Sequence, residues 1–291
     1  MKKCAIVRNG FFTCPAMDNQ IDSIFKELTL LGVEVDILKT DRLIASVSGG
    51  KIKSEIKRYD FIVFLDKDVY ISRMLEKSGA KLINSATAIE ICDDKMKTFI
   101  ALANSGINLP DTVASPLNYS ENADEFFKEV EKSIGYPVVV KEVFGSMGKS
   151  VYLAKDLKAL VTLRSELKSR PHLYQKFIGG GGRDYRVIVI GKKAVGVMER
   201  VNENDFRSNI ELGGKGKTAI LNDELKNLSE KVSKTLDLDY CGVDIISDGE
   251  KLYVCEVNSN AFFKGFTEVT GINVAKIYAK FLCDKFYGAK L

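Results

Sequence analysis

The sequence has a single histidine and no cysteine pair in a C-x-x-C spacing. A Ser-His-Asp or Cys-His mechanism would have to run through His172, which stands beside a proline in "SRPHLY" and which we interpret as an ordinary loop residue. The six cysteines are scattered, so we expect reduced thiols in a cytoplasmic protein, without a disulfide framework or a zinc site. We therefore expect the chemistry to depend on carboxylates, lysines, arginines and backbone amides.

Long apolar runs are also lacking. The longest, such as "FIVFL" and "YPVVV", are much shorter than a membrane span, and the apolar run near the N-terminus stops at Arg8, too early for a signal peptide. The net charge of +4, with 28% charged residues, is too small to indicate nucleic-acid binding by itself. We therefore expect no membrane or nucleic-acid partner. The length of 291 residues allows one large domain or two to three lobes.

The apolar pattern predicts an α/β start followed by an α+β remainder. Short apolar strands such as "CAIV", "VEVDIL" and "DFIVFLD" alternate with helical spacing, which is typical of a sheet covered by helices. Residues 86–104 look helical, and hairpins are predicted over 136–154 and 185–201. The turn after the first strand has no G-x-G-x-x-G, so a dinucleotide-binding fingerprint is absent.

The stretch "LYVCEVNSN" places Glu256 and Asn258 two positions apart in an apolar strand. If this strand pairs with "GVDII" through the polar turn "SDGEK", Asp244 faces Glu256, because their midpoint, residue 250, falls in that turn. The even spacings then place Asp244, Glu256 and Asn258 on one face. Leu252 and Val254 are expected on the same face. Two carboxylates and an amide oxygen at one point suit Mg²⁺; the alternative is ordinary solvated strand residues.

A second candidate is the turn in "VVVKEVFGSMGKSV". Lys141 ends a strand of β-branched residues, and Gly145 and Gly148 frame the turn that follows. Backbone N–H groups of such a turn and the lysine ammonium can hold phosphate oxygens. The turn leads into a strand, so it is not a P-loop, and the alternative is an ordinary glycine hairpin.

A third candidate is the donor-rich loop in "MERVNENDFRSNIELGGKG". It contains Arg200, Arg207 and Asn209, and a guanidinium fits carboxylates and phosphates bidentately. Taken singly, each arginine is more commonly a surface residue. The run "GGGG" at 179–182 is interpreted as a mobile loop.

Together these motifs resemble those of the RimK-like ATP-grasp ligases over essentially the whole chain. The stretches that carry the resemblance are "DDKMKTFIALANSGINLP", "YPVVVKEVFGSMGKSV", "YQKFI", "RDYRVIVIGKKAVGVMERV", "DFRSNIELGG", "GVDII" and "CEVNSN". The most specific are "DFRSN…GG" and "GVD…EVN". The chain departs from the family where Gln175-Lys176 replaces a common Gln-Glu, and where "AFFKG" replaces a common Pro-Gly beside the substrate pocket.

The resemblance implies an α/β N-terminal lobe followed by α+β ATP-grasp domains. A pre-ATP-grasp domain would span 1–88, a central lid domain 89–178, and a C-terminal ATP-grasp domain 179–291. The implied cofactors are ATP and Mg²⁺, with Mn²⁺ as an alternative metal.

Site residues also follow from the resemblance, position by position. Nucleotide contacts would come from Lys95, Lys141, the backbone of Lys176, Phe177 and Ile178, and from Asp184, Arg207, Ser208 and Asn209. The metal would be held by Asp244, Glu256 and Asn258. Arg200 and Arg207 would be catalytic and would stabilise developing negative charge.

The implied reaction is ATP-dependent ligation of a carboxylate to an amine through an acyl phosphate. The amine would be glutamate or another amino acid, and the carboxylate would belong to a small molecule or a peptide C-terminus. The alternatives are cross-linking of a precursor peptide, transfer of a phosphate to an alcohol, and nucleotide binding without turnover. The intact Asp-Glu-Asn set argues against the last. Neither the substrates nor a homo-oligomeric state follow from the sequence.

Overall fold

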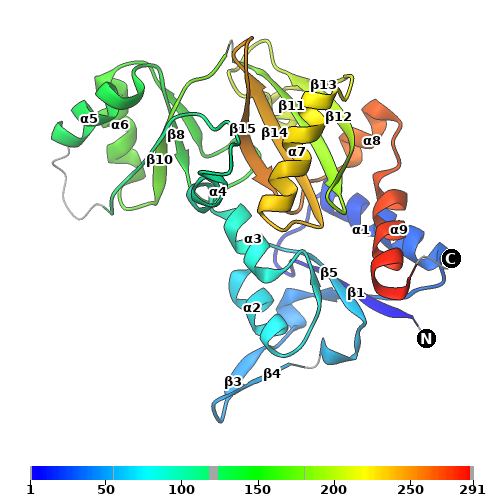
Figure 1. Ribbon diagram of the computed structural model, residues 1–291. Helices are drawn as coiled ribbons and strands as arrows, with labels where there is room; N and C mark the ends of the chain where they lie inside the picture. The colour runs from blue at the N-terminus through cyan, green and yellow to red at the C-terminus, as the bar shows by residue number, and fades with distance from the viewer. Residues whose placement is uncertain (1, 55, 118–123, 180, 289–291) are drawn as a thin grey trace.

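The protein is described by a computed structural model that covers residues 2–54, 56–117, 124–179 and 181–288. The strands of these residues form three larger sheets and one small hairpin. Figure 1 shows the first sheet in the lower part of the molecule, the second at the upper left, and the third at the upper right. No helix among the described residues combines the length and the apolar content that a membrane crossing requires.

The N-terminal sheet is fully parallel, with strand order β2-β1-β5-β6, as the alternating pattern predicted. Its strands are β1 (Lys3–Arg8), β2 (Glu34–Lys39), β5 (Phe61–Leu65) and β6 (Leu82–Ile83), and its helices are α1 (Pro15–Leu30), α2 (Val69–Lys77) and α3 (Ala86–Asp93). Two 3₁₀ turns (Thr40–Arg42 and Ile56–Arg58) and the hairpin of β3 (Ser46–Ser48) and β4 (Lys51–Lys53) complete it. Every residue of β5 is buried, because the helices cover both faces of the sheet.

The second sheet has the order β7-β10-β8-β9 and is antiparallel. Its strands are β7 (Thr112–Ala114), β8 (Val138–Glu142), β9 (Val151–Ala154) and β10 (His172–Lys176), and its helices are α5 (Asp124–Ile134) and α6 (Leu157–Leu167). The helix α4 (Lys95–Leu102) leads into it. The turn between β8 and β9 is the glycine-framed turn of the sequence, and we call it the lid turn (143–150).

The third sheet is antiparallel with order β13-β12-β11-β14-β15. It consists of β11 (Arg183–Ile190), β12 (Lys193–Val201), β13 (Lys215–Thr218), β14 (Tyr240–Ser247) and β15 (Leu252–Asn258), with a 3₁₀ turn (Ile210–Leu212) and the helices α7 (Asp223–Thr235), α8 (Lys264–Thr270) and α9 (Val274–Tyr287). One face packs on α7; the other packs on α8, α9 and the N-terminal helix α1. The first and third sheets therefore share one core. Figure 1 shows α1 and α9 side by side.

The pairing of β14 with β15 confirms the register predicted from even spacing. Asp244 lies opposite Glu256, and Gly242 opposite Asn258. The placement of Leu252 and Val254 on the same face was wrong, because the register shifts next to this pair, so that Val254 lies opposite Ile245 and Leu252 opposite Ser247. The extra residue, Cys255, inverts the alternation. Val254 is 1% exposed and packs with Ile245 in the core under α7, as the partly buried Leu252 does.

His172 begins β10 and is only 3% exposed, so its interpretation as a loop residue was wrong. Its Nδ1 lies 2.8 Å from the carbonyl of Arg170, and its Nε2 lies 2.7 Å from the hydroxyl of Tyr174. Because a carbonyl only accepts, Nδ1 carries the proton and Nε2 accepts from Tyr174. Burial lowers the pKa of His172, which keeps this pair neutral.

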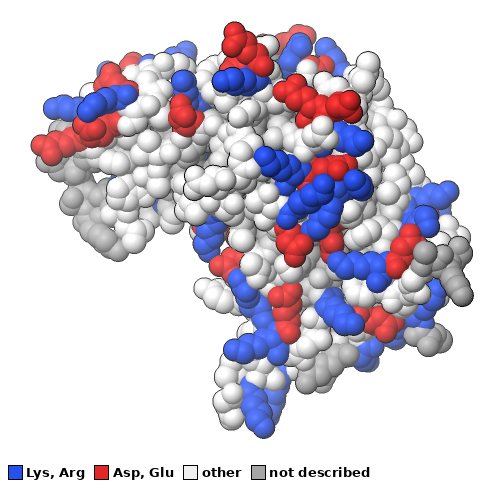
Figure 2. All heavy atoms as spheres, in the orientation of Figure 1, with Lys and Arg blue, Asp and Glu red and all other residues white. Residues whose placement is uncertain are grey.

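The remaining expectations concern cysteines and surface charge. All six cysteines are free thiols, as predicted. On the face shown in Figure 2, acidic and basic side chains are interspersed over the C-terminal lobe. The tip of the β3–β4 hairpin is blue in that view, and β4 begins and ends with lysine.

Candidate functional site

Two adjoining cavities lie where the three sheets meet. The lid cavity, about 100 Å³, lies between the second and third sheets, and the interlobe cavity, about 590 Å³, is bounded by all three parts of the chain. Every site residue predicted from the sequence lines one of them. Asn258 lines the interlobe cavity, whereas Arg200, Asn209 and Glu256 line both. The structure therefore brings the predicted residues together around one boundary.

Asp244 is the most buried carboxylate of this boundary, with 2% exposure. Its oxygens accept bonds of 2.8 and 2.7 Å from Nε and a terminal nitrogen of Arg186, and a nitrogen of Arg200 lies 2.9 Å away. Burial alone would raise the pKa of Asp244, but the charges of Arg186 and Arg200 outweigh it and hold the pKa below its ordinary value. Asp244 is therefore ionised and fixed in orientation.

Arg200 forms a second buried pair with Asp184, the residue across from it on β11. Its Nε donates to Asp184 Oδ1 at 2.7 Å, and a terminal nitrogen contacts the other oxygen. Burial would lower the pKa of Arg200, but the charges of Asp244 and Asp184 raise it. The result is a buried row of alternating charges, in which removal of one member leaves its neighbours unpaired.

The carboxylate and amide oxygens are of the type that binds Mg²⁺. They differ in how accessible they are to an ion in the cavities. Glu256 lines both cavities with 26% of its side chain exposed, and its Oε1 lies 3.6 Å from Lys95. Asn258 is partly exposed on the same face, whereas the oxygens of Asp244 are engaged by arginines. Among the described residues, no group of three or more His, Cys, Asp and Glu is suited to a metal. A site here would combine few protein oxygens with phosphate oxygens, as Mg²⁺ accepts.

Two buried lysines face the lid cavity. Lys141 is 5% exposed, and its ammonium lies 3.4 Å from the thiol of Cys255, with no carboxylate at ion-pair distance among the described residues. Burial raises the pKa of Cys255 although Lys141 opposes this, so the thiol stays neutral. The Lys95 ammonium donates to the carbonyl of Gly145 at 2.9 Å. Because a buried cation without an anion is costly, Lys141 is prepared for an anionic ligand.

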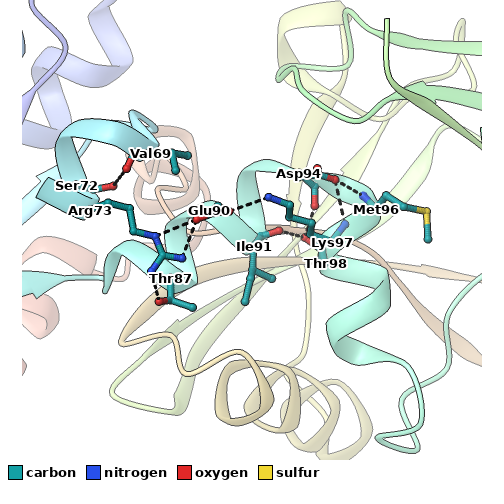
Figure 3. A network of polar contacts seen from close by, with 10 residues as sticks. All are labelled: Val69, Ser72, Arg73, Thr87, Glu90, Ile91, Asp94, Met96, Lys97 and Thr98. Atoms are coloured by element: carbon teal, nitrogen blue, oxygen red, sulfur yellow. Dashed lines mark hydrogen bonds and ion pairs between the residues drawn. The ribbon is translucent and has the colours of Figure 1, made fainter. Parts of the chain in front are cut away.

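The position of Lys95 depends on a corner between α3 and α4, shown in Figure 3. Asp94 lies between α3 and α4, and its side chain accepts from two N–H groups of the first turn of α4 at 2.9 and 3.0 Å. Glu90 accepts from Arg73 of α2 at 2.7 Å and from Lys97 of α4 at 2.8 Å. Hydrogen bonds from Lys97 and Arg73 lower the pKa of Glu90, so this exposed bridge remains charged. The corner turns Lys95 inward and leaves Lys97 outside.

Arg207 ties the lid turn to the loop after β12. Its guanidinium donates to Asp205 at 3.0 and 2.7 Å and to the carbonyls of Gly148 and Val151 at 2.9 and 3.2 Å. Gly148 has φ +71°, and a Cβ there would lie 2.5 Å from the side-chain oxygen of Asn209. Glycine is thus required by backbone and by space. These contacts give Arg207 a structural role in holding the lid turn. Its catalytic role stays a prediction.

The inner wall of the lid cavity is largely apolar. It is lined by Val139, Val151, Phe177, Ile178, Phe206 and Ile246. The N–H of Lys176 donates to the carbonyl of Asp111 at 2.8 Å, so this backbone donor is already engaged. A flat aromatic base fits such a wall.

Gly182, the last residue of the glycine run 179–182, is held by backbone hydrogen bonds. Gly182 donates to the carbonyl of Phe206 at 2.7 Å and accepts from the N–H of Asn202 at 2.6 Å. Its φ is +63°, and a Cβ would lie 2.2 Å from the carbonyl oxygen of Asn202. The interpretation of this run as only a mobile loop was therefore incomplete, because Gly182 packs tightly against the loop that carries Arg207.

Sequence analysis missed Arg186 and Cys255. Arg186 had a signal: it follows Asp184 by two positions in an apolar strand, the same spacing that identified Glu256 and Asn258. Cys255 had none, because it reaches the cavity through the bulge in β15.

Comparisons with known proteins identify a family and a fold. A family model described as the RimK-like ATP-grasp domain matches residues 92–282. Beta-citrylglutamate synthase B from Danio rerio is 37% identical over 224 residues, which is 75% of this chain and 54% of that protein. Glutamate--LysW ligase ArgX from Sulfurisphaera tokodaii is 30% identical over 241 residues, 79% of this chain and 83% of that protein. The chain therefore spans about half the length of the first of these relatives.

Among solved structures, D-alanine--D-alanine ligase from Bacillus anthracis complexed with ATP superimposes with a TM-score of 0.72. The alignment covers 98% of this chain and 96% of that chain at 18% identity. At this identity the likeness shows a shared fold.

Proposed function

This chain belongs to the RimK-like ATP-grasp family, and on that premise we propose that it is an ATP- and Mg²⁺-dependent ligase that joins a carboxylate to an amine. The observation that carries the proposal is the common boundary of the two cavities, formed by Arg200, Asn209 and Glu256. A nucleotide in the lid cavity would present its terminal phosphate at the place where a second substrate, in the interlobe cavity, presents its carboxylate.

The nucleotide is assigned to the lid cavity by its charged groups and its apolar wall. Lys141 supplies a buried cation without a carboxylate partner among the described residues, and Lys95 supplies a second cation beside the lid turn. The apolar wall around Phe177 suits the base. Phosphate oxygens would thus meet lysines while the base is shielded from water.

Glu256 and Asn258, with Asp244 behind them, would hold Mg²⁺ or, as an alternative, Mn²⁺. When bound, the ion supplies positive charge that offsets the gathering negative charge of the phosphates. Asp244 acts here mainly through Arg186 and Arg200, whose orientation it fixes.

The proposed reaction has two steps with balanced bonds. A carboxylate oxygen attacks the γ-phosphorus and the bond to ADP breaks, which yields an acyl phosphate. The nitrogen of an uncharged amine then attacks the acyl carbon, an amide bond forms, phosphate leaves and the nitrogen loses a proton. Arg200 is fixed at the boundary where the oxyanion develops, so it stabilises that charge without reorganising. No histidine or cysteine nucleophile is needed.

We propose an amino acid as the amine, with glutamate as the first candidate, because two relatives carry glutamate in their names. The carboxylate substrate is a small molecule or a peptide C-terminus. The division into domains at 1–88, 89–178 and 179–291 and the cytoplasmic location remain part of the proposal.

The test is a screen for ADP and phosphate release over the amino acids, with small carboxylates and peptides as partners. The proposal expects release that requires both a carboxylate and an amine, together with an amide product. Release that needs no amine and leaves a stable phosphorylated product would indicate a phosphotransferase instead.

A further inference from the structure

We infer that the interlobe cavity takes a carboxylate substrate that also carries a free ammonium group and an apolar body, and that Asp66 recognises the ammonium group. The inference rests on the proposed ligase function and deepens it. It names the chemical class of the carboxylate substrate, which neither the family nor the relatives' names specify for this chain.

Asp66 follows β5 directly, at the carboxyl end of the parallel N-terminal sheet, and lines the interlobe cavity. Three neutral donors hold its carboxylate: the Asn9 amide at 3.0 Å, the Thr40 hydroxyl at 3.3 Å and the N–H of Lys67 at 2.7 Å. The side chain is therefore fixed in orientation without being neutralised. Among the described residues, no lysine, arginine or histidine lies at ion-pair distance from it.

Of the charged residues that line the interlobe cavity, only acidic ones lack an ion-pair partner among the described residues. Its four basic residues each contact a carboxylate: Lys67 with Asp93 at 3.0 Å, Arg186 with Asp244 at 2.7 Å, Lys264 with Glu268 at 4.0 Å, and Arg200 with Asp184 and Asp244. Asp66 and the exposed Glu211 have no ion pair in the part of the chain that the structure describes. A partly buried carboxylate with no counter-ion favours a cationic group on the ligand and disfavours further carboxylates.

The lining of the interlobe cavity also has an apolar part. It contains Phe12, Met17, Leu65, Met198, Phe262 and Phe266. A volume of about 590 Å³ is within the usual range for small-ligand sites. The reacting carboxylate is placed at the Arg200 and Glu256 boundary, where the lid cavity begins, so the apolar body and the ammonium group extend toward the N-terminal sheet.

The test is hydroxamate formation, which detects carboxylate activation without the natural amine. Hydroxylamine attacks the acyl phosphate carbon, phosphate leaves and a hydroxamate remains. The probes are L-leucine, L-methionine and L-phenylalanine, each with its N-acetyl derivative, and citrate as a tricarboxylate. The full chain is assayed with ATP and Mg²⁺ as the wild type, as Asp66→Asn, and as Asp237→Asn, an exposed carboxylate that lines neither cavity.

We expect kcat/KM for the free amino acids to exceed that for the N-acetyl forms by about 10-fold or more, since a charge-assisted hydrogen bond is lost on acetylation. Asp66→Asn should abolish most of this preference, and Asp237→Asn should retain it. Wild-type preference for the N-acetyl acids or for citrate would overturn the inference while leaving the ligase function intact. A preference that persists in Asp66→Asn would overturn the assignment to Asp66.

Calorimetry separates this inference from the proposed function. If no probe yields hydroxamate, the ligase proposal fails for these acids, and direct binding of L-phenylalanine and N-acetyl-L-phenylalanine still decides the inference. Tighter binding of the free amino acid, lost in Asp66→Asn, supports the inference. Equal binding of the two overturns it.

Discussion

Asp244 and Glu256 lie directly opposite each other on β14 and β15, yet they have different partners. Asp244 is engaged by Arg186 and Arg200, whereas Glu256 lies 3.6 Å from Lys95 and reaches both cavities. Two carboxylates identified by one argument from spacing therefore have different roles: one fixes arginines, and the other is available to a ligand.

The first prediction separates these roles. Asp244→Asn leaves two largely buried arginines with less counter-charge, so the free energy of unfolding should fall by about 3–5 kcal/mol. Glu256→Gln should lose most turnover while its stability stays close to wild type. Urea unfolding and steady-state turnover on both variants are the measurements. Equal stability of the two variants would contradict the division of roles.

The second prediction concerns the pH dependence of stability. Because the pKa of Asp244 is lowered in the folded state, the unfolded chain binds a proton at this site more readily than the folded chain does. The stabilisation that ionised Asp244 provides is complete above the ordinary aspartate pKa of 3.8. It is lost as the pH falls below 3.8 toward the pKa of Asp244 in the folded state. Unfolding titrations should therefore show that the free energy of unfolding of the wild type falls between about pH 6 and acid by an amount that Asp244→Asn does not lose. Parallel curves for the two proteins would contradict this.

The third prediction concerns Lys141. Lys141→Met keeps most of the length of the side chain and removes the buried charge, so nucleotide affinity should fall by about 10-fold or more, the cost of a charge-assisted contact. The fold should be retained, because the variant removes a buried cation whose described partner is only a thiol. Calorimetry with ATP measures the affinity. Lys176→Met, at a half-exposed lysine that lines the same cavity, is the matched control and should change affinity less. Unchanged binding in Lys141→Met would remove it from the nucleotide site.

The fourth prediction concerns Arg207. A lysine keeps the charge but cannot contact Asp205 and the carbonyls of Gly148 and Val151 at once. Arg207→Lys should therefore lower saturated turnover by about 10²- to 10³-fold, the usual cost of losing a preorganised donor, with a smaller change in ATP affinity. If affinity collapses while saturated turnover stays normal, Arg207 is an ATP anchor and not a catalytic residue.

The sequence predicted the face that Asp244, Glu256 and Asn258 share, because strand periodicity and a polar turn determine a hairpin register. It could not predict the bulge at Cys255, which placed Val254 on the other face, since bulges depend on how the whole sheet packs. Helical spacing over 86–104 was continuous, yet the chain bends at Asp94, where a side-chain cap competes with the helix.

The site contacts that the sequence did not predict depend on pairing between strands that are far apart in the chain. The contacts that hold Arg200 between Asp184 and Asp244 join three strands, and no local pattern specifies which strand neighbours which. Arg186 was within reach of the period-two argument but was not singled out. The role of Asp66 depends on the ion pairs of every basic residue around the interlobe cavity, which only the folded structure provides.

The most direct test of the ligase proposal is the stoichiometry of one reaction. ATP, Mg²⁺, a carboxylate that supports hydroxamate formation, and glutamate or another amino acid are incubated with the protein, and ADP, phosphate and amide are measured together. The account predicts one ADP, one phosphate and one amide per turnover, and no amide without the amine. ADP formed with a stable phosphorylated product, or with no amide from any amine, would contradict it.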